Sequence, residues 1–119
     1  MKLPGPDHPI AISPAQGRVV VRFAGQTIAD TRHALELRES TYPAVLYIPR
    51  GDADMEHFAR TAHTTHCPYK GDASYFDLAA GDTRAANAVW SYEQPYPAMA
   101  AIKDHLAFYP QQVSIERTA

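Results

Sequence analysis

Short stretches in which apolar and polar residues alternate are the feature that most constrains how this chain can fold. Val19, Val21 and Phe23 alternate with Arg18, Val20 and Arg22, and similar stretches recur between glycine- or proline-containing turns. Because neighbouring side chains of a strand point to opposite faces, this period predicts half-buried β-strands. We expect strands over residues 18–23, 26–30, 35–38, 44–48, 75–80, 83–93 and 113–117. The 44–48 strand is apolar throughout, so it is expected to be central.

Two helical segments are expected within this β pattern. Residues 52–60 allow one or two helical turns, with Asp52 or Asp54 as the cap. A second helix begins near Pro97, a residue suited to the first turn, and ends before Pro110. Its apolar residues recur at helical spacing: Met99, Ile102, Leu106 and Tyr109. The predicted fold is therefore mainly β, a compact single domain with one α-helix in its C-terminal half packed on the sheet.

The chain divides into an arm, residues 1–16, and a single β-rich domain, residues 17–119. The arm is rich in proline and shows no helical period, so we expect it to be extended. Its Ile10 and Ile12 alternate with polar or small residues and are expected to pack on the domain. A length of 119 residues suits one domain with its own core.

Composition excludes several classes of protein. The net charge is −2 and the basic residues are scattered, so no nucleic-acid partner is expected. No apolar run approaches the length of about 18 residues that spans a membrane, and no secretory signal is visible. A single cysteine cannot form an internal disulfide, so a cytoplasmic location is expected. These features leave a homo-oligomer open.

The stretch "HTTHCPYKGDASYF", residues 63–76, gathers the residues that carry chemistry and is expected to form a loop. His63, His66 and Cys67 are ligand types that suit zinc. Neighbouring side chains such as His66 and Cys67 diverge in an extended segment, and no paired cysteines exist. We therefore expect no structural metal and no cofactor. A site with three ligands would use His63, His66 and a distant residue.

Cys67 is also a candidate nucleophile. Nearby cations such as Lys70 or a protonated His66 would favour its thiolate, which is the reactive form. His66 would act as the base, oriented by Asp72 or Glu93. The alternative is that Cys67 packs as a small apolar residue, which is common for a free cysteine.

The segment "PYKGD", residues 68–72, predicts a tight turn in which Gly71 takes positive φ. Such turns expose backbone amides, and Lys70 adds a positive charge suited to a phosphate or carboxylate. The alternative is an exposed lysine paired with Asp72 in solvent. Further along, "WSYE" ends the 83–93 strand; core packing is expected for Trp90, and a pocket rim for Glu93.

Several segments resemble one bacterial family, the domain of unknown function numbered 427. They are "PGPDHPI", "GRVVVRFAGQTIADT", "YPAVLYIPR", "HTTHCPYKGDASYF" and "AVWSYEQPYPAMAAIKDHLAFYP", which together cover nearly the whole chain. The resemblance implies a compact β-tent fold similar to Mss4-like proteins, although their paired zinc cysteines are absent here. The family is also filed under a nucleotidyltransferase-like label. Its motif is matched by Cys67, Pro68, Tyr69, Lys70, Gly71, Tyr75, Trp90, Tyr92, Pro95 and Phe108.

From these patterns we expect a pocket for a small, anionic molecule where the 63–74 loop meets the end of the "WSYE" strand. The candidate ligand-binding residues are Tyr69, Lys70, Gly71, Ser74, Tyr75, Trp90 and Tyr92. The candidate catalytic residues are Cys67, His66, Asp72 and Glu93. Two alternatives stay open: a non-enzymatic module that binds a protein or metabolite, and an enzyme of nucleotidyl transfer, as the family label suggests.

Overall fold

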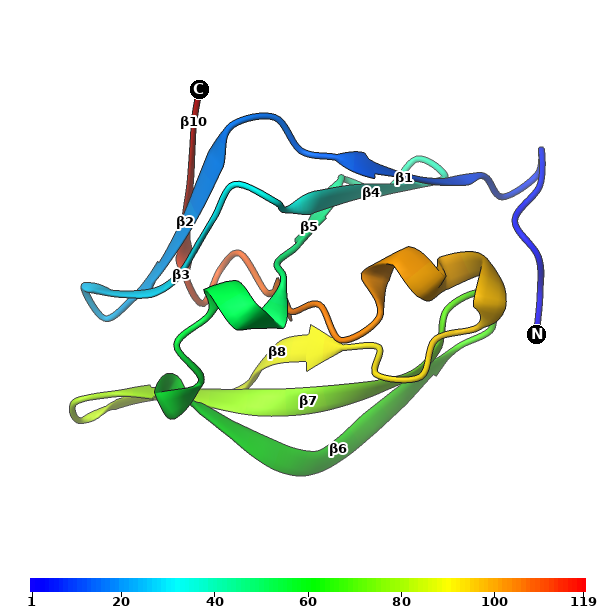
Figure 1. Ribbon diagram of the computed structural model, residues 1–119. Helices are drawn as coiled ribbons and strands as arrows, with labels where there is room; N and C mark the ends of the chain where they lie inside the picture. Colours follow the sequence, from blue (N-terminus) through cyan, green and yellow to red (C-terminus); the bar gives the residue numbers. More distant parts are fainter.

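The computed structural model describes residues 1–119, and most of its regular structure consists of β-strands (Figure 1). The strands are β1 (Ile10–Pro14), β2 (Arg18–Phe23), β3 (Gln26–Thr31), β4 (Leu35–Glu39), β5 (Val45–Tyr47), β6 (Phe58–Cys67), β7 (Gly71–Ala80), β8 (Thr83–Ser91), β9 (Ala107–Phe108) and β10 (Ser114–Thr118). Three short 3-10 helices connect them: η1 (Arg50–Asp52), η2 (Met55–His57) and η3 (Pro97–Ile102). The prediction of a mainly β, single-domain fold is confirmed.

The strands form three antiparallel sheets, with the orders β1-β4-β5, β10-β2-β3 and β6-β7-β8-β9. In Figure 1 the four-stranded sheet lies along one side, and the two three-stranded sheets lie opposite it. The alternation of apolar residues correctly located β2, β3, β4, β8 and β10. It also located β7, which begins at Gly71 rather than at Tyr75, and a turn at Gly81 joins it to β8.

Two groups of buried residues hold the sheets together. The first joins the β2–β3 hairpin to β7 and β8, through residues such as Val21, Ile28 and Leu78. The second joins β4, β5 and η3 to the other part of β7 and β8, through residues such as Leu37 and Ile102. Burial of these apolar side chains is the main force that stabilises the arrangement. The candidate site lies in the second group.

The predicted α-helix from Pro97 to Tyr109 is wrong. A 3-10 helix begins at Pro97, as the sequence indicated, but it ends at Ile102, and Asp104 then takes a positive φ of 62°. Leu106 is buried as expected, yet its backbone forms hydrogen bonds with Ile48, and the following residues form β9 against β8. Backbone pairing with distant strands therefore overrides the local helical period.

Four further expectations need correction. Residues 63–67 belong to strand β6, so the 63–74 segment is a β-hairpin with its turn at residues 68–70 and not a loop. Strand β5 lies at the edge of its sheet and is only partly buried, whereas the sequence suggested a central strand. On β8 the alternation breaks at Asn87, where φ is 50°, so that Ala86 is exposed while Ala88 is buried. The helical turns expected over residues 52–60 are shorter than predicted, and Asp54 caps η2.

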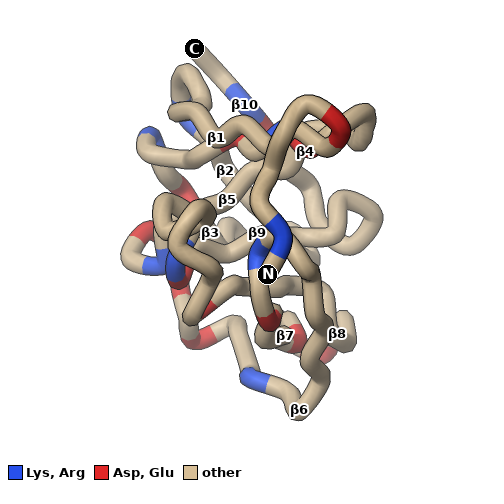
Figure 2. Tube along the Cα trace, turned by 90° about the vertical axis from the view of Figure 1, so that its right-hand side faces the viewer, with Lys and Arg blue, Asp and Glu red and all other residues tan.

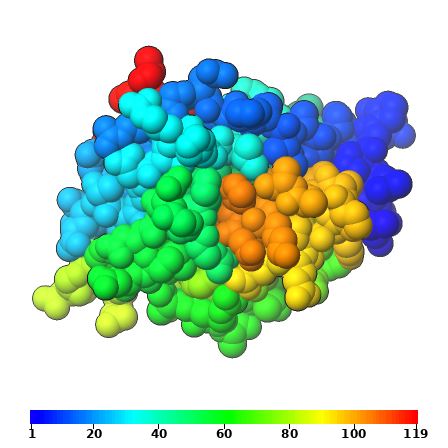
Figure 3. All heavy atoms as spheres, viewed as in Figure 1, coloured from blue at the N-terminus to red at the C-terminus, as the bar shows by residue number.

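The N-terminal residues lie against the domain. Residues Ile10–Pro14 form β1, which pairs with β4, and both Ile10 and Ile12 pack on the second group of buried residues. The backbone N–H of Lys2 donates to the carbonyl of Pro68 at 2.7 Å, so the first residues reach the turn between β6 and β7. Figure 3 shows these residues, in dark blue, along one side of the molecule.

Charged residues of both signs are interspersed along the chain (Figure 2). None of the helices has the length and apolar character that crossing a membrane requires. Gly71 has a positive φ of 108°, and there the chain enters β7 beside the backbone of Gln94 and Pro95.

Candidate functional site

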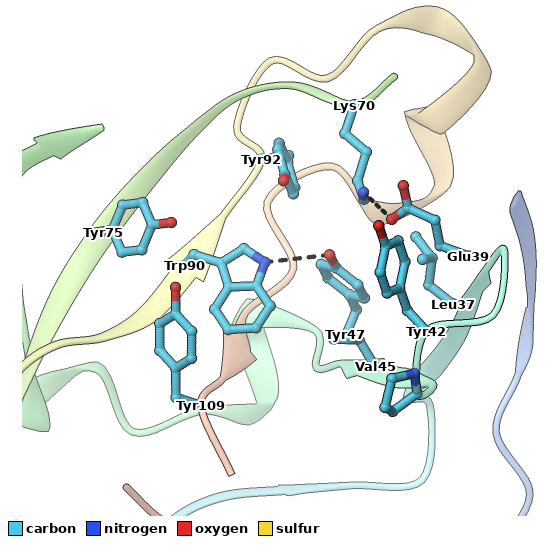
Figure 4. Close-up of a pocket in the computed structure, with 11 residues that line it drawn as sticks. Leu37, Glu39, Tyr42, Val45, Tyr47, Lys70, Tyr75, Trp90, Tyr92 and Tyr109 are labelled. Atoms are coloured by element: carbon cyan, nitrogen blue, oxygen red, sulfur yellow. Dashed lines mark hydrogen bonds and ion pairs between the residues drawn. The ribbon is translucent and has the colours of Figure 1, made fainter. Parts of the chain in front are cut away.

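A cavity of about 310 Å³ opens between β4, β5 and the ends of β7 and β8. It is lined mainly by aromatic side chains, with one lysine and one glutamate (Figure 4). The lining residues are Leu37, Glu39, Tyr42, Pro43, Val45, Tyr47, Lys70, Tyr75, Trp90, Tyr92 and Tyr109. Figure 4 shows Lys70 and Glu39 at one end, and Tyr75 and Tyr109 at the other. The cavity therefore has a charged end and an aromatic body.

Hydrogen bonds and ring contacts fix the aromatic walls. The indole Nε1–H of Trp90 donates to the hydroxyl oxygen of Tyr47 at 3.3 Å. The ring of Tyr109 lies against Trp90, with centroids 4.7 Å apart. The hydroxyl of Tyr75 is hydrogen-bonded to that of Thr65 at 3.0 Å. These contacts hold the rings in place around the cavity.

The hydroxyls of Tyr47, Tyr92 and Tyr109 stay protonated near neutral pH. Burial raises the pKa of Tyr47 and of Tyr92 well above the ordinary value for tyrosine. Burial and the neighbouring Tyr75 raise the pKa of Tyr109 to about 12. Each hydroxyl can therefore both donate and accept a hydrogen bond.

Lys70 and Glu39 form a largely buried ion pair at the charged end of the cavity. Nζ of Lys70 lies 2.5 Å from Oε1 of Glu39, and Nε2 of His8 donates to the other carboxylate oxygen at 2.7 Å. Burial alone would raise the pKa of Glu39, but the hydrogen bonds from Lys70 and His8 outweigh it and lower the pKa. Glu39 is therefore a carboxylate at neutral pH.

The alternative in which an exposed Lys70 pairs with Asp72 in solvent is wrong. Only 7% of the Lys70 surface is accessible, and its ammonium also lies 3.6 Å from Sγ of Cys67 and 5.9 Å from the ring centroid of Tyr92. The turn that precedes Gly71 directs the side chain inward, and the Lys70 carbonyl accepts from the backbone N–H of Tyr96.

The exposed histidine and aspartate lie on the other side of the hairpin. Nδ1 of His66 donates to Asp72 at 2.7 Å, and both side chains are largely exposed. This is the pair expected for a base oriented by a carboxylate. Cys67, its neighbour in sequence, instead contacts Lys70, because successive side chains of a strand point to opposite faces.

Three other predicted binding residues do not line the cavity. The ring of Tyr69 stacks on His8, with centroids 4.2 Å apart. Gly71 contributes through its backbone conformation, and Ser74 lies on β7 between Thr64 and Ser91. The predicted residues that do line the cavity are Lys70, Tyr75, Trp90 and Tyr92.

Glu93 is held by two arginines and does not orient a histidine. Arg60 donates to both of its carboxylate oxygens at 2.7 Å, and Arg50 donates to one of them at 2.9 Å. The Arg60 hydrogen bonds, opposed by partial burial and assisted by Arg50, lower the pKa of Glu93 to about 2. Arg50 also donates to the buried hydroxyl of Ser91, so this group of residues fixes the end of β8.

The possible metal ligands are dispersed. No group of three or more His, Cys, Asp or Glu side chains lies close enough together to hold a metal ion. His63 packs edge-on against the ring of Tyr75, with centroids 4.5 Å apart.

Comparison with known protein families gives one match. The family model described as "Domain of unknown function (DUF427)" matches residues 11–119. The chain belongs to this family. No curated protein matches the chain. All the residues that line the cavity fall within the part that matches the DUF427 model.

Sequence reasoning missed much of this DUF427 cavity. The missed residues are Leu37, Glu39, Tyr42, Pro43, Val45, Tyr47 and Tyr109. One signal was present: Glu39 continues the inward period of Leu35 and Leu37, so a carboxylate falls where the next core residue would be. A charge at a core position of a strand requires a partner, and Lys70 supplies it.

Proposed function

We propose that this protein binds a small aromatic molecule that carries an oxygen acceptor, as a carbonyl or a carboxylate, in the aromatic cavity. The observation that carries the proposal is the joining of an aromatic wall to a buried Lys70–Glu39 pair in one cavity of about 310 Å³. Cavities that bind small molecules are mostly apolar, contain few polar groups and have volumes from about 300 Å³ upward.

The aromatic body supports a planar ligand. Tyr47, Tyr92 and Trp90 offer ring faces and edges, and aromatic pairs gain about 0.5–1.5 kcal/mol beyond the burial of area. The protonated tyrosine hydroxyls provide further hydrogen-bonding groups along the wall. A flat molecule can therefore be held by stacking without large movement of the protein.

The charged end supports an oxygen acceptor. An ammonium has three N–H donors, and Lys70 directs two of them to Glu39 and Cys67. The remaining donor is available to a ligand oxygen. Because Glu39 balances the charge of Lys70, a neutral carbonyl fits this end as well as the anionic group that the sequence suggested.

Binding is the core of the proposal, and Cys67 is the catalytic candidate nearest to the cavity. Its Sγ lies beside the Lys70 ammonium that would hold the ligand. The His66–Asp72 pair lies at the exposed side of the hairpin. We therefore assign no chemical step to His66.

Thermal denaturation with benzamide, benzoate and their saturated analogue cyclohexanecarboxamide tests the proposal. Ligand at about a hundred times its dissociation constant would stabilise the fold by about 2.7 kcal/mol. We expect the aromatic compounds to raise the melting temperature more than the saturated one. Tyr42→Ala, which changes an exposed lining residue, should weaken the effect.

Tyr69→Ala is the matched control, because Tyr69 lies outside the cavity. It should leave the ligand-induced shift intact. The same assay includes ATP as a nucleotide probe. A melting temperature that none of these compounds raises would contradict the proposal. A shift caused by ATP alone would instead favour the function that the nucleotidyltransferase label suggests.

A further inference from the structure

A second cavity, of about 360 Å³, adjoins the first. It is lined by Tyr42, Pro43, Ala44, Val45, Leu46, Trp90, Phe108, Pro110 and Ile115, and no charged residue takes part. Its lining comes from β5, β9, β10 and the loop before β5, together with Trp90 of β8. Nothing in the proposed function yet uses this apolar space.

Four residues line both cavities. These shared residues are Tyr42, Pro43, Val45 and Trp90. Tyr42 is 65% exposed and lies in the loop between β4 and β5, so few contacts hold its ring in place. A ligand bound in the first cavity would therefore contact side chains that also line the second.

We propose that the second cavity is a subsite of the same binding site and takes an apolar extension of the aromatic ligand. This inference rests on the proposed function. The ligand is then elongated and amphipathic: its oxygen acceptor lies at Lys70, its ring lies among the tyrosines, and an alkyl or second aryl group lies in the second cavity.

The chemistry of the lining selects the occupant. A polar extension would lose its hydrogen bonds to water among Leu46, Phe108 and Ile115, and burial of an unpaired polar group is costly. A methylene group gains about fourfold in affinity when it leaves water for apolar surroundings. The second cavity therefore selects ligands by the length of their apolar chain, whereas the Lys70 end selects them by their oxygen acceptor.

Titration with 4-alkylbenzamides and 4-alkylbenzoates, from methyl to pentyl, tests the inference. The fluorescence of Trp90, the single tryptophan, reports binding because its ring borders both cavities. We expect the dissociation constant to fall by about fourfold for each added methylene until the second cavity is filled.

Ala44→Leu and Ala44→Phe fill the second cavity in two steps from an exposed position that does not line the first. They should flatten the dependence on chain length progressively and leave the affinity for the methyl compounds unchanged. Ala86→Phe adds the same ring at an exposed position on β8 outside both cavities, and it should keep the dependence.

The outcomes separate the two proposals. If the methyl compounds bind but longer chains do not raise the affinity, the subsite is overturned and the proposed function stands. The same holds if the increase in affinity with chain length persists in Ala44→Phe. A series in which no member binds would overturn both.

Discussion

Nζ of Lys70 lies 2.5 Å from Oε1 of Glu39, a residue 31 positions earlier in the chain. The pair joins the turn between β6 and β7 to the end of β4, and both side chains are largely buried. Glu39 of the pair also contacts His8, and Lys70 also contacts Cys67. This pair defines the polar end of the aromatic cavity and also connects the second group of buried residues to the hairpin.

Lys70→Met should lower the free energy of unfolding by about 3 kcal/mol, because it leaves the Glu39 carboxylate without its partner in a mostly buried place. The double variant Lys70→Met/Glu39→Gln should recover part of this loss. Denaturation with urea measures both. Lys103→Met removes an exposed lysine and is the control. A loss no larger than that of the control would show that the pair contributes nothing.

Gly71→Ala should destabilise the fold by about 2 kcal/mol, because alanine resists the φ of 108° that this position requires. The added Cβ would also lie 3.4 Å from the carbonyl oxygen of Gln94. Gly51→Ala is the control, since that position has no positive φ and nothing within 4 Å of an added Cβ. Equal melting temperatures for the two variants would refute the strain.

Glu93 should make stability depend on pH in the acid range. Its pKa falls to about 2 in the folded protein from an ordinary value of 4.5, so its contribution is complete above about pH 4.5. The contribution is lost as the pH falls through 2, because protonation breaks the bonds to Arg60 and Arg50.

The difference in unfolding free energy between the wild type and Glu93→Gln measures this effect. We expect about 1 kcal/mol above pH 5, since the group is partly screened by solvent, and a difference that shrinks toward pH 2. Glu56→Gln shows the effect of removing an exposed carboxylate elsewhere. A difference for Glu93→Gln that stays constant between pH 5 and 2 would rule out the low pKa.

Deletion of residues 1–14 should lower the melting temperature by several degrees, because β1 and its packed Ile10 and Ile12 are lost. A loss of about 1 kcal/mol corresponds to roughly 4–8 °C in a domain of this size class. Deletion of residues 1–7 keeps β1 and the bond from His8 to Glu39, so its effect should be smaller. Equal melting curves for the full chain and the longer deletion would show that β1 adds no stability.

Most of the strands outside β1, β6 and β9 could be predicted because their signal is local. Val19, Val21 and Phe23 are all buried on β2, as the alternation predicted, and Val20 is buried as well. The local pattern does not determine the structure of the segment from Pro97 to Tyr109. Its apolar spacing is real, yet the backbone of Leu106 bonds to Ile48, a contact that no local pattern contains. Tertiary pairing decided the structure there.

Only the part of the candidate site that comes from neighbouring stretches of sequence could be predicted. Trp90 and Tyr92 follow one another at strand spacing, and Lys70 lies in a turn with a positive-φ glycine, so their neighbourhood was accessible from the sequence. The opposite wall comes from β4, β5 and the loop between them, far away in the chain. An exposed Lys70 was considered because turn residues usually lie in solvent. The contact with Glu39, far away in the sequence, is what draws the side chain inward.

The single indole N–H signal of Trp90 in a ¹H–¹⁵N correlation spectrum tests the central claim most directly. This group donates to Tyr47 in the wall of the cavity, and the chain has no other tryptophan. Titration with benzamide or benzoate should move the signal in a saturable way, and Tyr42→Ala should weaken the apparent affinity. A Trp90 signal that stays fixed at saturating concentrations of both compounds would contradict binding in the aromatic cavity.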